Sequence, residues 1–231
     1  MSMGFSTRWV AAGAIAIIAG RLCAQEQEPH QPYEPIYRAW IEAGPVFLQR
    51  TDLHGFPGAP GASKLETDPG VRVGVGSAYA LAPYFSVDWE VAVLASSVKK
   101  VSGLDQVDGR ITQVPFLVSG TLQYENQTGV TPFVGVGVGA APTAINLDKA
   151  RRGTTALEGS DYDFTFAWQL AGGVKYAVNR RLGLGVLYKY LWTSDAKWEV
   201  NNNTPLATAG TKLEVDGLRS HAILAFVSYR F

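Results

Sequence analysis

Bulky apolar side chains alternate with small or polar ones along most of the chain after residue 36. In the segment FTFAWQLAGGVKYAV (164–178), for example, Phe166 and Trp168 alternate with Ala167 and Gln169. Such alternation predicts β-strands, because successive side chains of a strand point to opposite faces. The pattern predicts an all-β chain with eight strands, over 37–50, 70–82, 84–96, 110–125, 130–145, 161–178, 181–195 and 213–231.

The breaks between these segments are alternately short and long. Tight turns are predicted at 82–83, 125–129 and 179–180, and long polar loops at 51–69, 97–109, 146–160 and 196–212. A barrel that crosses an outer membrane has this asymmetry, with short turns at the periplasmic end and long loops outside. The loop lengths therefore predict an eight-stranded antiparallel, up-and-down transmembrane β-barrel over residues 36–231.

The two faces of the predicted strands indicate which one meets lipid. The strand from 84 places Phe85 and Trp89 on one face and Asp88 and Glu90 on the other. The other strands divide similarly, with Gly and Ala dominating the second face. A soluble barrel would bury the bulky set and expose a charged set, whereas Gly and Ala suit the cramped interior of a narrow barrel. We therefore predict that the bulky face points outward to lipid; the alternative is a soluble periplasmic lipocalin-like binder.

Aromatic residues support this assignment because they gather near both ends of the predicted strands. Two belts of aromatic side chains are typical of the two membrane interfaces. The predicted lower belt holds Tyr79, Phe85, Tyr124, Tyr176, Tyr229 and Phe231, and the upper belt holds Phe47, Phe164, Phe166, Tyr190 and Trp192.

Several charged residues fall on the inward face of these strands. The predicted lumen charge network consists of Glu42, Arg72, Asp88, Glu90, Lys175 and Lys189, accompanied by Gln113, Gln123 and Gln169. The interior of an eight-stranded barrel is filled by side chains, and opposite charges there must pair because an isolated buried charge is very unfavourable. The favoured interpretation is a structural plug, and the alternative is a narrow conduit for small or apolar solutes.

The first 24 residues have the three-part organisation of a secretory signal peptide. Arg8 precedes the apolar run VAAGAIAIIAG (10–20), and cleavage is expected after Ala24. The run is shorter than the roughly 20 residues of a transmembrane helix, and Leu22 before Cys23 disfavours a lipoprotein. Residues 25–35 are polar and read as a periplasmic leader. Since Cys23 is the only cysteine, the mature chain would have no disulfide and no thiolate metal site.

Two segments resemble a known family, the small bacterial outer-membrane barrels of the OmpA, OmpX and OmpW type. The chain ends in HAILAFVSYRF (221–231), and TPFVGVGVGA (131–140) is similar to their glycine-alternating strand. The resemblance implies the same fold and the same location in the outer membrane. It also implies that Val227, Tyr229 and Phe231 form the signal read by the barrel-assembly machinery, although Phe226 stands where that signal often has Gly.

Candidate chemistry is sparse, and we predict no enzyme, no cofactor and no metal site. His30, His54 and His221 are the only histidines, and the His-x-Ser pair of lipid-modifying barrels is absent. Loop carboxylates could bind Ca²⁺ weakly, although no EF-hand spacing occurs; they are Asp52, Glu66, Asp68, Asp105, Asp108, Asp148, Glu158 and Asp161. The basic residues Lys149, Arg151 and Arg152 could contact lipopolysaccharide phosphates. With 20 basic and 20 acidic residues, nothing indicates a nucleic-acid partner, and we expect a monomer with a structural or surface-interaction role.

Overall fold

The computed structural model describes residues 36–54, 63–102, 106–126, 128–152, 155–199 and 212–231. These residues belong to one compact unit that runs from Pro35 to Phe231. The predicted signal peptide (1–24) and leader (25–35) lie outside the described residues. No helix among the described residues is long and apolar enough to span a membrane.

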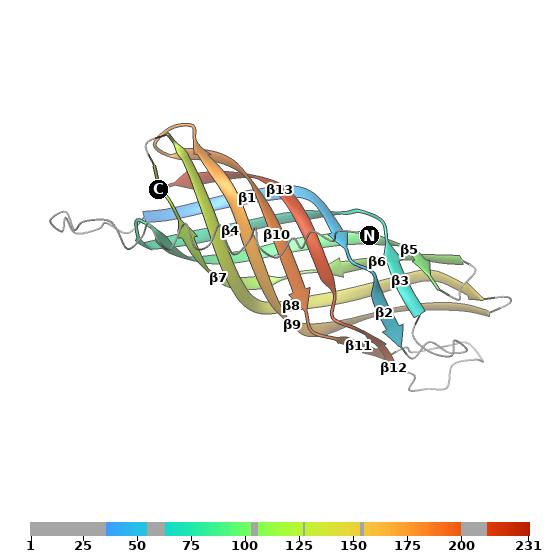
Figure 1. Cartoon of the computed structure of the whole chain (residues 1–231). Coiled ribbons are helices and arrows are strands. Elements are labelled where there is room, and N and C mark those ends of the chain that lie inside the picture. The colour runs from blue at the N-terminus through green and yellow to red at the C-terminus, as the bar shows by residue number, and fades with distance from the viewer. Residues whose placement is uncertain (1–35, 55–62, 103–105, 127, 153–154, 200–211) are drawn as a thin grey trace, which may run out of the picture. The chain divides into compact units, whose positions relative to one another are not determined.

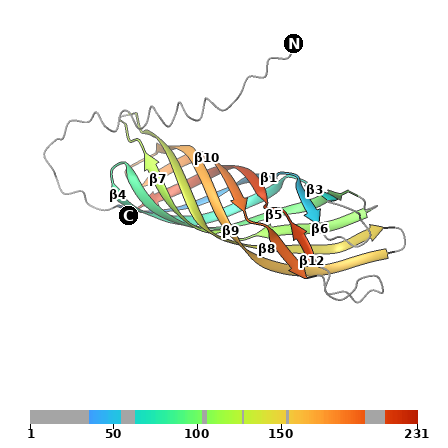
Figure 2. The same ribbon diagram turned by 60° about the horizontal axis from the view of Figure 1, so that its bottom comes forward.

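Antiparallel strands wind obliquely around a common axis and close into a barrel (Figures 1 and 2). The wall is formed in order by β1 (Ile36–Leu48), β4 (Gly70–Ala82), β5 (Phe85–Val101), β6 (Gln106–Gln113) with β7 (Phe116–Gln123), β8 (Val130–Arg152), β9 (Thr155–Ala177), β10 (Leu182–Thr193) and β13 (Arg219–Arg230). Pairing of β1 with β13, for example Glu42 opposite Phe226, closes the ring. With β6 and β7 counted as one interrupted strand, this is the predicted eight-stranded barrel.

The interruption between β6 and β7 has a local cause. Pro115 has no backbone N–H and cannot donate to a neighbouring strand. Its carbonyl still accepts a hydrogen bond from Ala92 N at 3.1 Å, and Val114 N donates to Pro142 O at 2.9 Å. The wall therefore stays hydrogen-bonded to both neighbours across the break.

The short turns lie at the end of the barrel where β1 begins and β13 ends, as predicted. In the turn after β9, Asn179 Oδ1 accepts hydrogen bonds from the backbone N–H groups of Arg181 and Leu182, each at 2.8 Å. Asparagine stabilises turns in this way. The turn before β8 uses Gly129 at φ 75°, a conformation that favours glycine.

The opposite end differs from prediction, because much of the sequence expected to form long loops is β-structure. Strands β8 and β9 continue to Arg152 and Thr155 and include most of the predicted loop 146–160. Four short strands, β2 (Thr51–His54), β3 (Ser63–Thr67), β11 (Ala196–Glu199) and β12 (Lys212–Val215), extend from β5 in the order β3, β2, β12, β11. The predicted single strand 213–231 was also wrong, since Asp216 to Leu218 separate β12 from β13. Strands therefore pair through their backbones beyond the segments in which apolar and polar residues alternate.

The bulky face points outward, as predicted. Phe166 and Val186 are 54% and 55% exposed, and Val73 on β4 is 53% exposed. Their sequence neighbours Ala167, Leu187 and Arg72 are buried in the interior. Bulky side chains therefore cover the outside of the barrel, and its interior is where charge and chemistry must be sought.

Candidate functional site

The barrel interior is crossed by a network of four charged side chains from four strands. Lys189 Nζ on β10 lies 2.7 Å from Glu42 Oε1 on β1 and 2.6 Å from Glu90 Oε2 on β5. Arg72 on β4 donates to Glu90 through Nη2, and its Nε lies 3.5 Å from Glu42 Oε1. Each anion therefore contacts both cations. We call these four residues, with Gln169, the lumen network.

Gln169 on β9 connects the lumen network to the far wall. Its Oε1 accepts a hydrogen bond from Arg72 Nη2 at 2.7 Å, and its Nε2 donates to Glu90 Oε2 at 3.1 Å. The charged side chains of the network are 0–5% exposed. Such charges persist in a dry interior only when they are mutually paired and hydrogen-bonded. The network joins four strands across the lumen, and its ions cannot separate without exposing unpaired charge.

Strand register and small residues explain why these side chains meet. Glu42 lies opposite Gly74, and Gly76 lies opposite Glu90. A Cβ atom at Gly74 would lie 3.1 Å from both Cγ and Oε1 of Glu42. Gly74 thus leaves the space into which the Glu42 carboxylate extends, and Gly76 leaves space for the Trp40 indole, which is the role expected for small residues in a narrow barrel.

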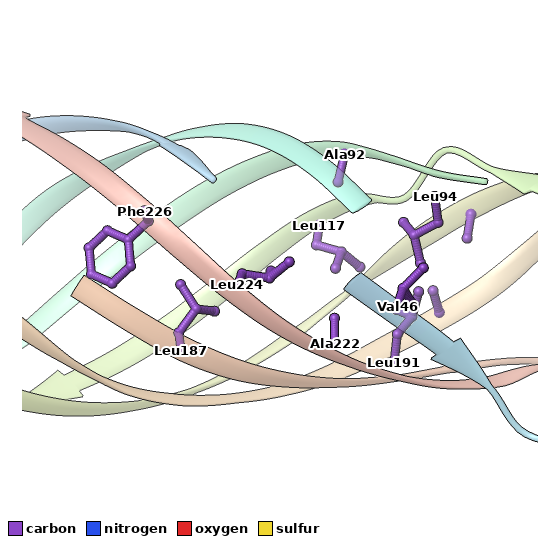
Figure 3. Close-up of a cluster of buried hydrophobic side chains, with 11 residues drawn as sticks. Val46, Ala92, Leu94, Leu117, Leu187, Leu191, Ala222, Leu224 and Phe226 are labelled. Carbon is purple, nitrogen blue, oxygen red and sulfur yellow. The ribbon is translucent and has the colours of Figure 1, made fainter. Parts of the chain in front are cut away.

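An apolar cluster occupies the lumen beyond the network, toward the end that carries β2, β3, β11 and β12. Further along β1, β5 and β10 from the charged residues, the inward side chains are Val46, Leu94 and Leu191, each at most 1% exposed. Figure 3 shows them pointing into the interior with Leu117 and Ala222. The sequence interpretation missed this cluster because it described the inward face by its glycines, alanines and charges. The sequence did contain the signal, because Leu94 and Leu191 alternate in step with the inward residues Glu90 and Lys189 of the same strands.

The structure does not bring all six predicted network residues together. Asp88 accepts hydrogen bonds from Ser86 at 2.7 Å and Thr121 at 2.5 Å instead of pairing with a cation. Lys175 lines a cavity nearer the short-turn end and forms no ion pair among the described residues. The glutamines Gln113, Gln123 and Gln169 are all buried, as predicted for inward positions.

The histidines form no pair with a serine hydroxyl among the described residues. Ser220 points inward and is buried, whereas His221 points outward, because adjacent strand residues face opposite sides. His221 Nδ1 lies 2.5 Å from Tyr188 Oη, and its Nε2 lies 2.5 Å from Gln49 Nε2. His54 pairs with Asp216 at 3.5 Å, and His30 lies outside the described residues.

No group of three or more metal-ligating side chains occurs within the described part of the chain. Glu66 pairs with Arg50 at 3.1 Å, and Asp68 with Lys99 at 3.6 Å. Asp52 lies in β2, which pairs with β3, and Asp108 lies in β6, which pairs with β5. The remaining candidates are outside the described side chains: the carboxylates Asp105, Asp148, Glu158 and Asp161, and the basic residues Lys149, Arg151 and Arg152.

The aromatic belts are present on the outer surface. Tyr176 and Tyr229 are exposed beside the short turns, and Phe47, Phe164 and Phe166 are exposed toward the other end. A closed barrel with an apolar exterior, aromatic belts and a filled interior is typical of a bacterial outer-membrane protein. Residues 48–231 match the sequence profile of the family described as "Outer membrane protein beta-barrel domain". The chain belongs to this family.

Membership places the protein in the outer membrane and excludes the soluble periplasmic binder. Among solved structures, outer membrane protein OprG from Pseudomonas aeruginosa is 18% identical, with 84% of this chain and 95% of OprG covered and a TM-score of 0.58. The outer membrane protease OmpT from Escherichia coli is 10% identical, with 89% and 99% covered and a TM-score of 0.55. These identities show a shared barrel fold alone. No curated protein sequence matches the chain.

Proposed function

We propose that the protein is a structural and surface-interaction barrel that is closed to solutes. The lumen network carries this proposal, since its four ions meet across the interior and are almost fully buried. The apolar cluster of Val46, Leu94 and Leu191 supports it, because a solute would have to pass both layers. Opening a path would separate buried ions, which is strongly unfavourable.

The length of β8 and β9 supports a role outside the membrane. Each has 23 residues, whereas about 9–11 residues of a tilted strand cross a bilayer. At about 3.3 Å per residue each strand extends roughly 75 Å along its path, so about half of it projects beyond the hydrocarbon. The β8–β9 hairpin and the sheet of β3, β2, β12 and β11 form the surface that would meet partners.

We further propose that the barrel is a monomer with no catalytic role, in contact with outer-membrane lipid and lipopolysaccharide. The opposite directions of Ser220 and His221 support the absence of catalysis. The apolar outer face and its aromatic belts fit a lipid environment. Assembly by the barrel-assembly machinery through Val227, Tyr229 and Phe231 fits their outward positions on and beside β13.

Conductance across planar lipid bilayers tests the closed lumen. The wild-type protein is expected to give no discrete current steps. A variant carrying Glu42→Ala, Lys189→Ala and Leu191→Ala is expected to give them, because it removes three of the four ion pairs of the lumen network and part of the apolar cluster. Arg50→Ala with Glu66→Ala, in an exposed pair, is the matched control and should stay silent. Discrete steps from the wild type would overturn the proposal in favour of the narrow conduit.

Labelling on intact cells tests the exposed surface. Because Cys23 is the only cysteine and lies in the predicted signal peptide, single cysteines can be placed at exposed Asp108 in β6 or at Asn126 in a short turn. A membrane-impermeant maleimide should label Asp108→Cys on intact cells, and Asn126→Cys only after the outer membrane is permeabilised. The reverse result would place the β8–β9 hairpin in the periplasm and contradict its surface role.

A further inference from the structure

The lumen is not filled uniformly, and its short-turn half contains open space. A cavity of about 100 Å³ lies directly beneath the lumen network. It adjoins a second cavity of about 210 Å³ at the short turns. Arg38, Lys175 and Ser228 line both cavities, so the two lie side by side at this end of the lumen. We call the two together the short-turn chamber.

The deep part of the chamber has aromatic walls and a closed roof. Trp40, Phe133 and Phe226 line it, and the rings of Phe133 and Phe226 meet edge to face at 5.8 Å between centroids. The roof consists of Glu42, Glu90, Lys189 and Gln169, whose polar atoms are already paired within the lumen network. The one other carboxylate of the deep part, Asp88, is hydrogen-bonded to Ser86 and Thr121.

The outer part of the chamber is strongly basic. Five cationic side chains and a single carboxylate, Glu125, line it; the cations are Arg38, Lys175, Arg180, Arg181 and Arg230. Arg38 on β1 lies directly opposite Arg230 on β13, an arrangement of like charges that destabilises a sheet. No ion pair among the described residues includes any of the five cations. The described side chains of the rim therefore carry an excess of positive charge.

We propose that the short-turn chamber binds a small organic anion, with its acidic group at the basic rim and its apolar part against the aromatic walls. An apolar cavity of roughly 150 Å³ holds one benzene molecule, and the deep cavity has about 100 Å³. The apolar part is thus a short chain or a single ring that enters partway. The ligand class is a monocarboxylate, sulfonate or phosphate with such a group. The site opens at the end opposite the β8–β9 hairpin, so it is separate from the surface proposed to meet partners.

Fluorine NMR of 4-fluorobenzoate with the full-length mature protein in lipid nanodiscs tests the proposal. The signal should broaden and shift with saturable dependence on protein, beyond that of empty nanodiscs, and unlabelled benzoate should reverse the change. The neutral 4-fluorobenzyl alcohol should bind about tenfold or more weakly, because it lacks charge-assisted hydrogen bonds to the rim. Equal binding of the acid and the alcohol would overturn the assignment.

Variants locate the binding within the chamber. Arg38→Gln with Lys175→Gln should weaken binding of 4-fluorobenzoate about tenfold, while Arg50→Gln with Arg219→Gln, at the other end, should leave it unchanged. Ser119→Phe, which fills the deep cavity, should also abolish saturable binding while leaving the basic rim intact. Unchanged binding in both chamber variants would show that the anion adsorbs elsewhere and refute the site. Conductance reports on the lumen network independently, so the two proposals can fail separately.

Discussion

Lys189 Nζ lies 2.7 Å from both carboxylate oxygens of Glu42, although β10 and β1 are not neighbours in the barrel wall. Strand β13 separates them, so the contact spans the interior and not the sheet surface. A pair of this kind connects non-adjacent strands and opposes any widening of the barrel between them. This is why the proposed closure of the lumen rests on the ion pairs and not on backbone pairing.

Removing one partner of this pair should destabilise the barrel strongly. Lys189→Met leaves Glu42 with Arg72 Nε at 3.5 Å as its remaining cation. Breaking a buried pair on one side costs about 3–5 kcal/mol, because an uncompensated charge stays in the interior. The double variant Glu42→Leu with Lys189→Met should recover most of this loss, since both charges are gone. Urea unfolding in lipid vesicles, followed by the gel mobility of unheated samples, measures the free energies.

The exposed pair of Arg50 and Glu66 provides the control. Its side chains are 73% and 30% exposed, and exposed pairs contribute about 0–1 kcal/mol. Arg50→Met should therefore change the free energy of unfolding by no more than about 1 kcal/mol. Strictly additive losses in the Glu42 and Lys189 double variant would contradict the coupling, because residues in one ion-pair network are expected to be non-additive.

A second prediction concerns Gly76, which lies opposite Trp40 in the pairing of β1 with β4. A Cβ atom at Gly76 would lie 2.2 Å from Cζ2 of Trp40, so the indole occupies the glycine's side-chain space. Gly76→Val should displace Trp40, shift the tryptophan fluorescence and destabilise the barrel by about 1–3 kcal/mol. Gly120→Ala is the matched control, since its nearest atom would be 3.4 Å away. Equal effects of the two substitutions would count against this packing.

Alternation predicted the wall of the barrel well because lipid and lumen impose opposite demands on successive residues. Strand β4 coincides with its predicted range, 70–82. Above the membrane both faces meet water, so alternation weakens while backbone pairing continues. This is why β8 and β9 were predicted to end near 145 and begin near 161, although they extend to Arg152 and from Thr155.

The lumen was harder to predict than the wall. The alternation of residues along a strand shows which side chains face inward. It does not give the register of neighbouring strands, which sets the level along the barrel axis at which those side chains lie. Glu42, Arg72, Glu90 and Lys189 come together only because the register brings four strands to one level. Asp88 has the same parity as Glu90 but lies one inward position nearer the short turns. Phe226 stands where the C-terminal assembly signal often has Gly. It points inward beside Gly185 and lines the short-turn chamber.

A third prediction tests the outward orientation of the bulky face. Val186 is 55% exposed on β10, and its neighbours across the strands are Val174 and Ala225. Val186→Arg should cost about 2–4 kcal/mol in a lipid bilayer, because an arginine at that depth meets hydrocarbon. Val178→Arg, in the turn just after β9, should cost about 0–1 kcal/mol because it lies near the interface. If Val178→Arg were the more harmful of the two in urea unfolding, the membrane would not lie across the middle of β10.

The last prediction concerns the C-terminal residues that resemble an assembly signal. Val227 and Tyr229 on β13, together with Phe231, point outward and are 39%, 40% and 79% exposed. The backbone N–H of Phe231 donates a hydrogen bond to the carbonyl of Tyr37 at 3.1 Å, and this bond survives a side-chain change. Phe231→Ala should therefore leave refolding into lipid vesicles almost unchanged, with a change in stability below about 1 kcal/mol, as for most surface substitutions.

In cells, where the barrel-assembly machinery would read the residue, the Phe231→Ala variant should reach the outer membrane in several-fold lower amount, as quantified by fractionation and gel mobility. Ser228→Ala, which removes an inward hydroxyl beside Gly183, is the control. If Phe231→Ala reduced refolding yield and cellular yield by the same factor, the residue would contribute to folding and not to recognition.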